Sequence, residues 1–479
     1  MIETLPAGPG PGIPWCPMAK LAALVSYAYQ ALLAFGSLLI IARVLGAAEY
    51  SIYSIFIATT QLAAIGSFEW IRFACSRFYP GVDQDAERAQ RGTMFREFLL
   101  SLGVCAAIIF LAAVVGVLSL QLAILGLLVI VLQGWTDLHL TMLRFRDEMA
   151  AFSWLQGLRA TSVALGAVVG ALALNSAVGA MYGITVGYIC VTLLAFANAR
   201  REPRLPGIWN TSVARMHLQY GSASAVASVI GLTAPLGLRF VLQGAFGVAA
   251  AGPLLAIDLC QRPFVLVLSA VQGIQYPALV RAYDGKEASF GATCGSYYAL
   301  LVTLALLAGG AVAAILPLLA NWMVPTDMQA AFMGTSAALL VVFLLRAITQ
   351  NVFTTPAHLT RDLKAITVLA AADAALLIGP AAVVAFWANG AMEIVCLAGA
   401  MGSATYAALG FSTLRRLPCR PWIRPAAVAA VAVLACLVVS SWTWTVVGAL
   451  WSMAIGSVLG VAALWSLYAD TRSTPNNGV

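Results

Sequence analysis

Arginines and carboxylates that lie within long apolar stretches are the residues of this sequence most able to do chemistry. A charged side chain at the centre of a membrane helix costs about 2.5–3.5 kcal/mol on insertion scales, so it faces a cavity or a partner. An arginine there offers a fixed charge and a planar fork of donors to an anion, whereas a carboxylate can pair with a cation or act in a gate. The set is Arg72, Arg159, Arg239, Arg262 and Arg346, with Glu69, Asp137, Asp258 and Asp373.

The spacing of these residues leaves two interpretations open. Arg262 lies about twelve residues into its apolar stretch, near the bilayer midplane, and Asp258 lies one helical turn away on the same face. In the functional interpretation, Arg262 contacts an anion and the charges nearer the cytoplasm form an ionic gate. In the structural interpretation, Asp258 with Arg262 and Glu69 with Arg72 are intrahelical pairs, and arginines near helix ends snorkel to the headgroups. Asp258 and Asp373 are also candidates for binding a coupling proton or sodium ion.

The composition indicates whether the segments that carry these residues face water or lipid. Of the 479 residues, 62% are hydrophobic and 9% are charged, and the mean hydropathy is +0.92. A soluble protein carries roughly 25% charged residues, so this chain must face lipid. Apolar runs of about 20 residues match membrane helices, whereas strands of a membrane barrel would alternate in polarity every residue. The sequence therefore predicts an all-α polytopic membrane protein.

Charges and turn residues divide the chain into about fourteen spans. The predicted spans are 20–44, 50–75, 97–118, 121–143, 152–174, 177–198, 216–243, 249–275, 291–319, 328–350, 366–388, 390–412, 425–446 and 447–468. They group into spans one to six (20–198), spans seven to twelve (216–412) and two extra C-terminal spans (425–468). Residues 1–19 and 469–479 are expected to be cytoplasmic tails, the first of them disordered.

Basic residues gather in every second connection and predict the orientation. The connections after even-numbered spans hold Arg77, Arg88, Arg91, Arg96, Arg144, Arg146, Arg200, Arg201, Arg204, Arg215, Arg281, Lys286, Arg361, Lys364, Arg415, Arg416, Arg420 and Arg424. Because positively charged loops stay in the cytoplasm, both termini are expected there. This places Arg239 toward the outside, and it places Glu69, Arg72, Asp137, Arg159, Arg346 and Asp373 in the cytoplasmic thirds of their spans.

Several functions are disfavoured by what the sequence lacks. The net charge of +7 follows from the topology and does not indicate nucleic-acid binding. No CxxC pair or His–Cys spacing suggests a metal, and no Walker A or Rossmann motif suggests a nucleotide cofactor. The predicted external connections are too short to hold the catalytic residues of a polymerase or glycosyltransferase. We therefore expect a protein that is not an enzyme and uses no metal or cofactor.

Two hairpins carry a recognisable pattern. Residues 39–54 read LIIARVLGAAEYSIYS and residues 66–80 read GSFEWIRFACSRFYP. Together they resemble the opening hairpin of the polysaccharide exporters, the O-antigen or lipid-linked-oligosaccharide flippases, with Ser51 where that family usually has glycine. Residues 247–257, GVAAAGPLLAI, resemble the start of the second half of that family. Aligning Gly46 with Gly247 puts Ser51 on Gly252, as an internal duplication requires.

The resemblance implies a fold and a function. It implies two six-helix lobes around a central cavity that opens alternately to the two sides of a bacterial inner membrane, with spans thirteen and fourteen outside that core. The implied activity is movement of undecaprenyl-pyrophosphate-linked oligosaccharide to the outer leaflet for O-antigen, capsule or exopolysaccharide assembly, by a monomer that cooperates with a polysaccharide polymerase and glycosyltransferases.

Within that cavity, the arginines of the set, Arg262, Arg72, Arg159, Arg346 and Arg239, would contact the pyrophosphate. The carboxylates Asp258, Glu69, Asp137 and Asp373 would gate the cavity or couple it to an ion. The alternatives are a multidrug or cation antiporter of the same superfamily and, less favoured, a membrane polymerase or glycosyltransferase.

Overall fold

The computed structural model describes residues 17–78, 84–116, 118–145, 148–199, 207–285, 290–360, 362–413, 430 and 446–472, and no strand occurs among them. The helices of the first part are α1 (Pro17–Phe78), α2 (Gln84–Val114), α3 (Leu120–Phe145), α4 (Met149–Leu174) and α5 (Ala177–Ala199). Then follow α6 (Thr211–Phe246), η1 (Gly247–Ala250), α7 (Ala251–Asp284), α8 (Phe290–Trp322), α9 (Thr326–Ile348), η2 (Thr349–Phe353), α10 (Thr355–Leu359), α11 (Leu363–Ala382), η3 (Val383–Trp387), α12 (Met392–Thr413) and α14 (Val446–Arg472). The predicted all-α class is confirmed over this part of the chain.

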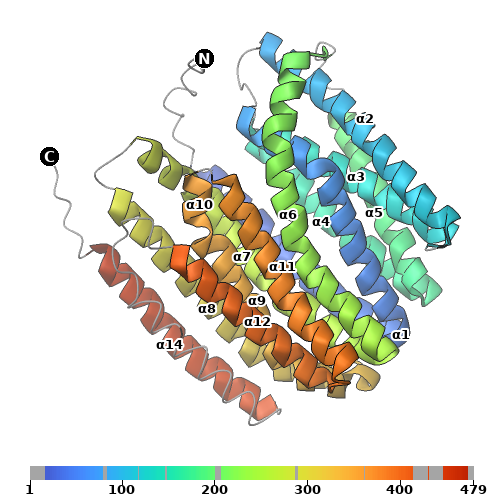
Figure 1. The fold of residues 1–479 in the computed structure, drawn as a ribbon, viewed down its shortest axis with the longest axis vertical. Helices are drawn as coiled ribbons and strands as arrows, with labels where there is room; N and C mark the ends of the chain where they lie inside the picture. The colour runs from blue at the N-terminus through green and yellow to red at the C-terminus, as the bar shows by residue number, and fades with distance from the viewer. Residues whose placement is uncertain are drawn as a thin grey trace.

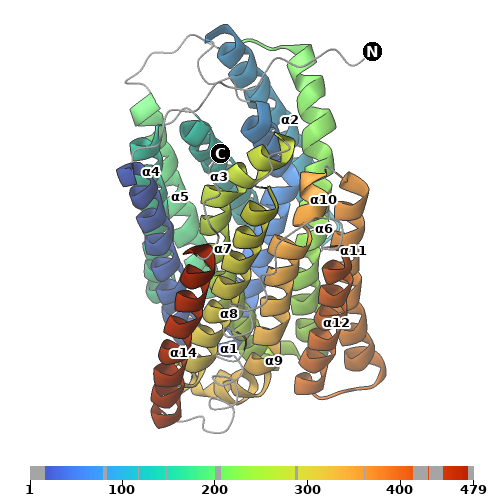
Figure 2. The same cartoon turned by 90° about the vertical axis from the view of Figure 1, so that its left-hand side faces the viewer.

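Eleven stretches of the described residues are long and apolar enough to cross a membrane. Two of them, Leu32–Cys75 and Ala225–Leu268, are 44 residues long, which is about 66 Å of helix and twice the hydrocarbon thickness. Each contains a break at a glycine with positive φ, Gly46 at 66° and Gly247 at 57°, so each has the length and the turn for two crossings. Figure 2 shows the two halves of α1 meeting near the lower end of the molecule. The predicted span 425–446 lies almost wholly outside the described residues, and the total of fourteen stays a prediction.

One end of the molecule collects the turns between helices, and we call it the Gly46 end. Contacts join the Gly46 turn to the starts of α5 and α9 and to the end of α8. Two asparagines with a left-handed backbone, Asn175 and Asn389, close the α4–α5 and η3–α12 hairpins, each with φ of 46°. Asparagine tolerates this conformation better than most residues, and it is a frequent helix terminator. The opposite end, which holds the starts of α2 and α6, we call the His217 end.

Helices α4 and α5 pack through glycines. A Cβ added at Gly183 would lie 1.8 Å from the carbonyl oxygen of Gly166, and one at Gly170 would lie 2.1 Å from that of Gly179. The two backbones therefore touch with no side chain between them. Small residues give this close approach in lipid, where dispersion contacts replace the hydrophobic effect as the force between helices.

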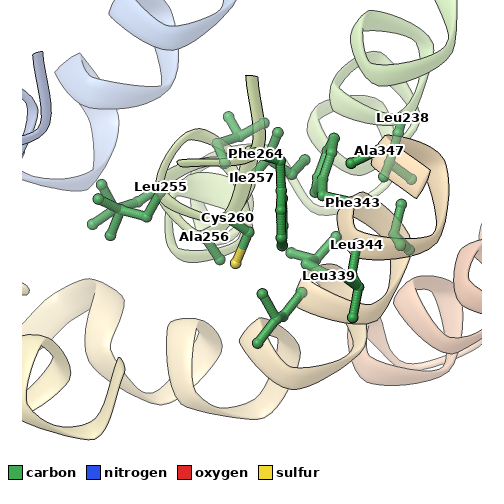
Figure 3. Packing of buried hydrophobic residues seen from close by; sticks show 14 of the residues in the cluster. Leu238, Leu255, Ala256, Ile257, Cys260, Phe264, Leu339, Phe343, Leu344 and Ala347 are labelled. Carbon is green, nitrogen blue, oxygen red and sulfur yellow. The ribbon is translucent and has the colours of Figure 1, made fainter. Parts of the chain in front are cut away.

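The largest apolar core lies where α7 packs against α9 and α8. Figure 3 shows Ile257, Cys260 and Phe264 of α7 facing Leu339 and Phe343 of α9. Ala256, Ile257, Cys260 and Leu339 are completely buried. Side chains packed this tightly give α7 little freedom to shift on its own. The charged residues on α7 are therefore held in fixed positions.

Helices α2 and α14 lie on opposite edges of the molecule (Figure 1). Helix α14 packs on α8, and α2 packs mainly on α1 and α3. The prediction began the span of α2 at residue 97, whereas the helix begins at Gln84. The extra turns are charged, and ion pairs between Arg88 and Asp85 (3.6 Å) and between Arg91 and Glu87 (3.3 Å) support them outside the apolar segment.

The glycine contact between α4 and α5 yields a stability prediction. The Gly183→Ala substitution should destabilise the protein by about 1–3 kcal/mol, because the new methyl group must separate two backbones in contact. Gly157→Ala on α4 is the matched control, since a Cβ there has no atom within 4 Å. The midpoint of thermal unfolding in detergent measures both variants. Equal midpoints for the two would contradict the packing described.

Candidate functional site: a polar cavity and the charge clusters around it

A polar cavity of about 310 Å³ lies among α1, α3, α4, α5 and α7. Its ionisable lining residues are Asp137, Arg159 and Arg262, and they are joined by the amides Gln30, Gln61 and Gln133 and by the phenols Tyr53 and Tyr188. The formal charge of this lining is +1, from two arginines and one aspartate. The cavity therefore combines hydrogen-bond donors with a small excess of positive charge, within the helices that are apolar enough to span a membrane.

Arg159 and Asp137 form a salt bridge across the cavity wall, from α4 to α3. The Arg159 side chain is 14% exposed and that of Asp137 is 28% exposed. Arg159 also donates to Oε1 of Gln156 at 3.2 Å, and the amide of Gln156 donates to Gln30 of α1. This chain of contacts ties the first half of α1 to α3 and α4, and it neutralises Asp137.

Arg262 is held differently. Its Nη1 donates to the backbone carbonyl of Ala34 in α1 at 2.7 Å, and among the described residues no carboxylate forms a salt bridge with it. A carbonyl oxygen orients the guanidinium but brings no formal negative charge. Arg262 thus brings to the cavity a positive charge that no salt bridge among the described residues neutralises, which suits an anion.

Asp258 does not pair with Arg262, contrary to the structural interpretation of the sequence. Its Oδ1 accepts from Nη2 of Arg239 at 3.0 Å, and its Oδ2 accepts from Tyr50 at 2.7 Å and Ser54 at 2.9 Å. Nη1 of Arg239 also donates to Ser54 at 2.6 Å. Arg239 on α6 and Asp258 on α7 lie at similar distances from the Gly247 turn that joins these helices. The turn therefore brings the two side chains together. The resulting cluster joins α1, α6 and α7.

Charged residues of the Gly46 turn bind the ends of other helices. Nη1 of Arg43 donates to the carbonyl of Trp322, the last residue of α8, at 2.7 Å. Oε2 of Glu49 accepts from the backbone N–H of Ala177, the first residue of α5, at 2.7 Å. Oδ2 of Asp327 accepts from the backbone N–H of Ala47 at 2.9 Å. Cations suit the carboxyl ends of helices and anions suit the amino ends, so the motif around Gly46 fastens the turns of this end together.

The remaining predicted residues form two further pairs away from the cavity lining. Glu69 and Arg72 pair within α1, as the structural interpretation expects. Arg346 of α9 pairs with Asp373 of α11 through Nε–Oδ1 at 2.8 Å and Nη2–Oδ2 at 2.7 Å, with side chains 5% and 1% exposed. Gln350 donates to the same carboxylate at 2.9 Å, and Arg346 donates to the carbonyl of Gly231 in α6 at 3.0 Å. Arg239 and Arg346 do not line the cavity.

Sequence reasoning missed several polar residues of these sites. Tyr50, Ser54 and Gln30 carry no charge, so the search for ionisable residues within spans passed over them. Their only sequence signal is position: Tyr50 and Ser54 lie four and eight residues after Gly46, on one face of a helix. A buried Glu97–His217 pair was also missed, because both residues lie near predicted span ends.

The fold is similar to that of solved membrane transporters over most of the chain. A structure of the lipid II flippase MurJ in an inward closed conformation has a TM-score of 0.68 at 11% identity, covering 95% of this chain and 100% of that one. A multidrug resistance transporter of the MATE family, in an inward-facing conformation, has a TM-score of 0.61 at 13% identity, covering 83% and 97%. A MOP superfamily transporter from Pyrococcus furiosus has a TM-score of 0.57 at 14% identity, covering 83% and 95%. No family model and no curated protein matches the chain.

The chain therefore has the fold of the MOP superfamily transporters. This agrees with the fold that the resemblance of the two hairpin motifs implies. The solved proteins to which the fold is similar are a lipid II flippase and transporters. Among them, the flippase MurJ matches over the greatest share of this chain.

The Asp258 cluster yields a prediction that tests whether Asp258 and Arg239 stabilise each other as an ion pair. Asp258→Asn and Arg239→Gln should each destabilise the protein by about 3–5 kcal/mol, because each leaves the other charge buried and uncompensated. The double variant should lose about 2 kcal/mol less stability than the sum of the losses of the two single variants. Thermal unfolding in detergent gives all three values. Tyr50→Phe, which removes one hydrogen bond of the cluster, should cost about 1 kcal/mol, and strict additivity of the charge variants would refute the pairing.

Proposed function

We propose that this chain is a flippase that moves an undecaprenyl-pyrophosphate-linked oligosaccharide from the cytoplasmic to the outer leaflet by alternating access. The product would feed O-antigen, capsule or exopolysaccharide assembly, together with a polymerase and glycosyltransferases. The observation that carries the proposal is Arg262, a cavity arginine held by a backbone carbonyl with no carboxylate partner among the described residues. A pyrophosphate is the anion that a fixed, forked cation binds best.

The charge of the cavity favours a lipid-linked anion over a cationic drug. Of the three ionisable lining residues, Asp137 is already neutralised by Arg159, which leaves Arg262 to set the local field. A cationic substrate would need an unpaired carboxylate in that position. The match to the flippase MurJ over nearly the whole chain supports the same reading, while the MATE-like structures keep multidrug transport as the competing outcome of the test below.

The remaining predicted residues receive roles from their contacts. Arg159 would be the second pyrophosphate contact, released from Asp137 when substrate enters. Arg72, whose side chain is 43% exposed and paired with Glu69, would receive substrate near the entrance. Arg239 with Asp258 and Arg346 with Asp373 would act in gating rather than in binding, because each arginine already holds a carboxylate.

Alternating access follows from the size of the cavity. A volume of about 310 Å³ is at the lower limit of roughly 300–1,000 Å³ for ligand sites, so a pyrophosphate with several sugars requires the helices around it to separate. In the predicted orientation the Gly46 end faces outward. The Asp258 cluster and the Arg43 and Asp327 contacts would then close the outer side while the cavity receives substrate from the cytoplasm.

The test is complementation in a flippase-deficient bacterium, with lipid-linked oligosaccharide quantified on each leaflet. The unmodified chain should restore outward movement. Arg262→Ala should lower it at least about 100-fold, because the loss of a bidentate charged contact removes roughly 3 kcal/mol. Arg262→Lys should recover only part of it, since an ammonium cannot form the fork.

Arg144→Ala is the matched control, an exposed arginine at the end of α3 that lies outside the cavity lining. It should transport as the unmodified chain does, and membrane insertion of every variant is checked by immunoblotting. If the unmodified chain moves no lipid-linked glycan from any donor but confers drug resistance, the flippase proposal is wrong and the multidrug alternative replaces it.

A further inference from the structure

Three polar side chains form a buried group at the His217 end, between α2 and α6. Nδ1 of His217 lies 2.9 Å from Oε2 of Glu97, and Nε2 of His217 lies 2.7 Å from Nε2 of Gln90. The side chain of His217 is completely buried and that of Glu97 is 4% exposed. The second carboxylate oxygen, Oε1 of Glu97, is buried with no hydrogen-bond partner. No contact of the cavity or of the Gly46 end uses these residues.

The group lies at a close junction of backbones. The N–H of Ile208 donates to the carbonyl of Arg88 at 3.0 Å, and the N–H of Asn210 donates to Oγ1 of Thr93 at 3.0 Å. A Cβ added at Gly92 would lie 2.3 Å from the backbone nitrogen of Ile208. The segment that leads into α6 is therefore clasped to the first turns of α2. The Glu97–His217 contact lies at the inner side of this clasp.

Glu97 differs from the other buried carboxylates in the chemistry of its partner. Among the acidic residues of the described chain that are less than 9% exposed, Glu69 pairs with Arg72 and Asp373 pairs with Arg346. Asp258, only slightly more exposed, pairs with Arg239. An arginine keeps its charge at every physiological pH. An imidazole, unlike a guanidinium, can gain and lose a proton at physiological pH, so the Glu97–His217 contact alone in this group has a strength that a proton can change.

The three side chains can take up a proton at Nε2 of His217 without moving a helix. With Gln90 donating to Nε2, the imidazole is neutral and its Nδ1–H donates to Glu97. A proton added at Nε2 needs only a half-turn of the Gln90 amide, whose oxygen then accepts from it.

Few groups face the pair among the residues that the structure describes. From α2 they are Gln90 and Glu97 themselves, and from α1 the ring of Phe78 stacks on His217 with centroids 6.4 Å apart. The nearby charges of α2 are engaged elsewhere, Arg91 with Glu87 and Arg96 over the ring of Trp209. Within the described part of the chain, the charge on the pair is therefore set mainly by Glu97 and His217 themselves.

We propose that Glu97 and His217 form a proton-binding site that latches α2 to α6, so that proton binding tightens the His217 end and proton loss loosens it. The ligand is a proton, and its transport meaning rests on the proposed flippase function: the latch would couple opening of the cytoplasmic side to pH. A protonated imidazole makes a charge-assisted hydrogen bond to the carboxylate, roughly twice as strong as the neutral one.

The first experiment measures the latch itself. Hydrogen–deuterium exchange of the purified full chain, corrected for the intrinsic pH dependence of exchange, reports on residues 84–99 and 207–217. Protection there should fall about fivefold as the pH rises from about 6 to about 8. Glu97→Gln and His217→Gln should each abolish this dependence, while His358→Gln, a histidine of α10, should retain it. A dependence that persists in both pair variants, or that is absent from the unmodified chain, overturns the proposal.

A second readout covers the case in which the Glu97 variant does not fold. The chain has three histidines, so nitrogen-15 spectra of the labelled unmodified protein resolve them, and the signal missing in His217→Gln is that of His217. This signal must titrate over the pH range in which protection changes. A His217 signal that stays constant across that range refutes the latch without need of the Glu97 variant.

The third arm separates the latch from the transport function. In proteoliposomes loaded with lipid-linked oligosaccharide, an imposed pH gradient should change the rate of movement by the unmodified chain and not by His217→Gln. Arg262→Ala should lose transport yet keep the pH-dependent protection. Absence of transport with protection intact counts against the flippase proposal alone, and transport indifferent to the gradient in the unmodified chain counts against coupling through the latch.

Discussion

The buried carboxylate of Asp258 is the constraint on which the site depends. A carboxylate within a membrane helix must be compensated, and Asp258 is compensated by Arg239, Tyr50 and Ser54 from two other helices. These contacts fix α1, α6 and α7 to one another at a single depth. They also occupy Asp258 completely, which leaves Arg262, one turn further along α7, with only a backbone carbonyl. The positive field of the cavity is therefore a consequence of where Asp258 finds its partners.

Helix ends explain the motif that surrounds Gly46. Each helix leaves unpaired N–H groups at its start and unpaired carbonyls at its end, which side chains or water must satisfy. Arg43 serves the end of α8 and Glu49 serves the start of α5. Gly46 supplies the left-handed turn that lets both side chains project from one short segment. A pattern of arginine, glycine and glutamate three residues apart thus organises turns that are distant in sequence.

The sequence was a good guide to elements and a poor guide to partners. Apolar runs predicted the helices, because their length and composition depend on the bilayer alone, and the motifs located the turns at Gly46 and Gly247. The pairing of Asp258 was wrong in the structural interpretation, since spacing within one helix favoured Arg262. Arg239 was preferred because α6 and α7 meet at the Gly247 turn, a tertiary fact that residue spacing does not carry. Uncharged Tyr50 and the interfacial Glu97–His217 pair gave no signal above that of ordinary polar residues.

The two ends of the molecule are held by different chemistry, and this difference bears on how such a fold can alternate. At the Gly46 end, the arginine pair and the backbone caps contain no group that changes charge in the physiological pH range, so substrate binding rather than proton binding would have to release them. At the His217 end, one contact of the clasp contains histidine, whose charge varies in the physiological range. A protein that must open one end at a time gains from such asymmetry, because substrate acts on one closure and protons on the other. Substrate binding then has to release only the contacts of the Gly46 end, and proton loss only those of the His217 end.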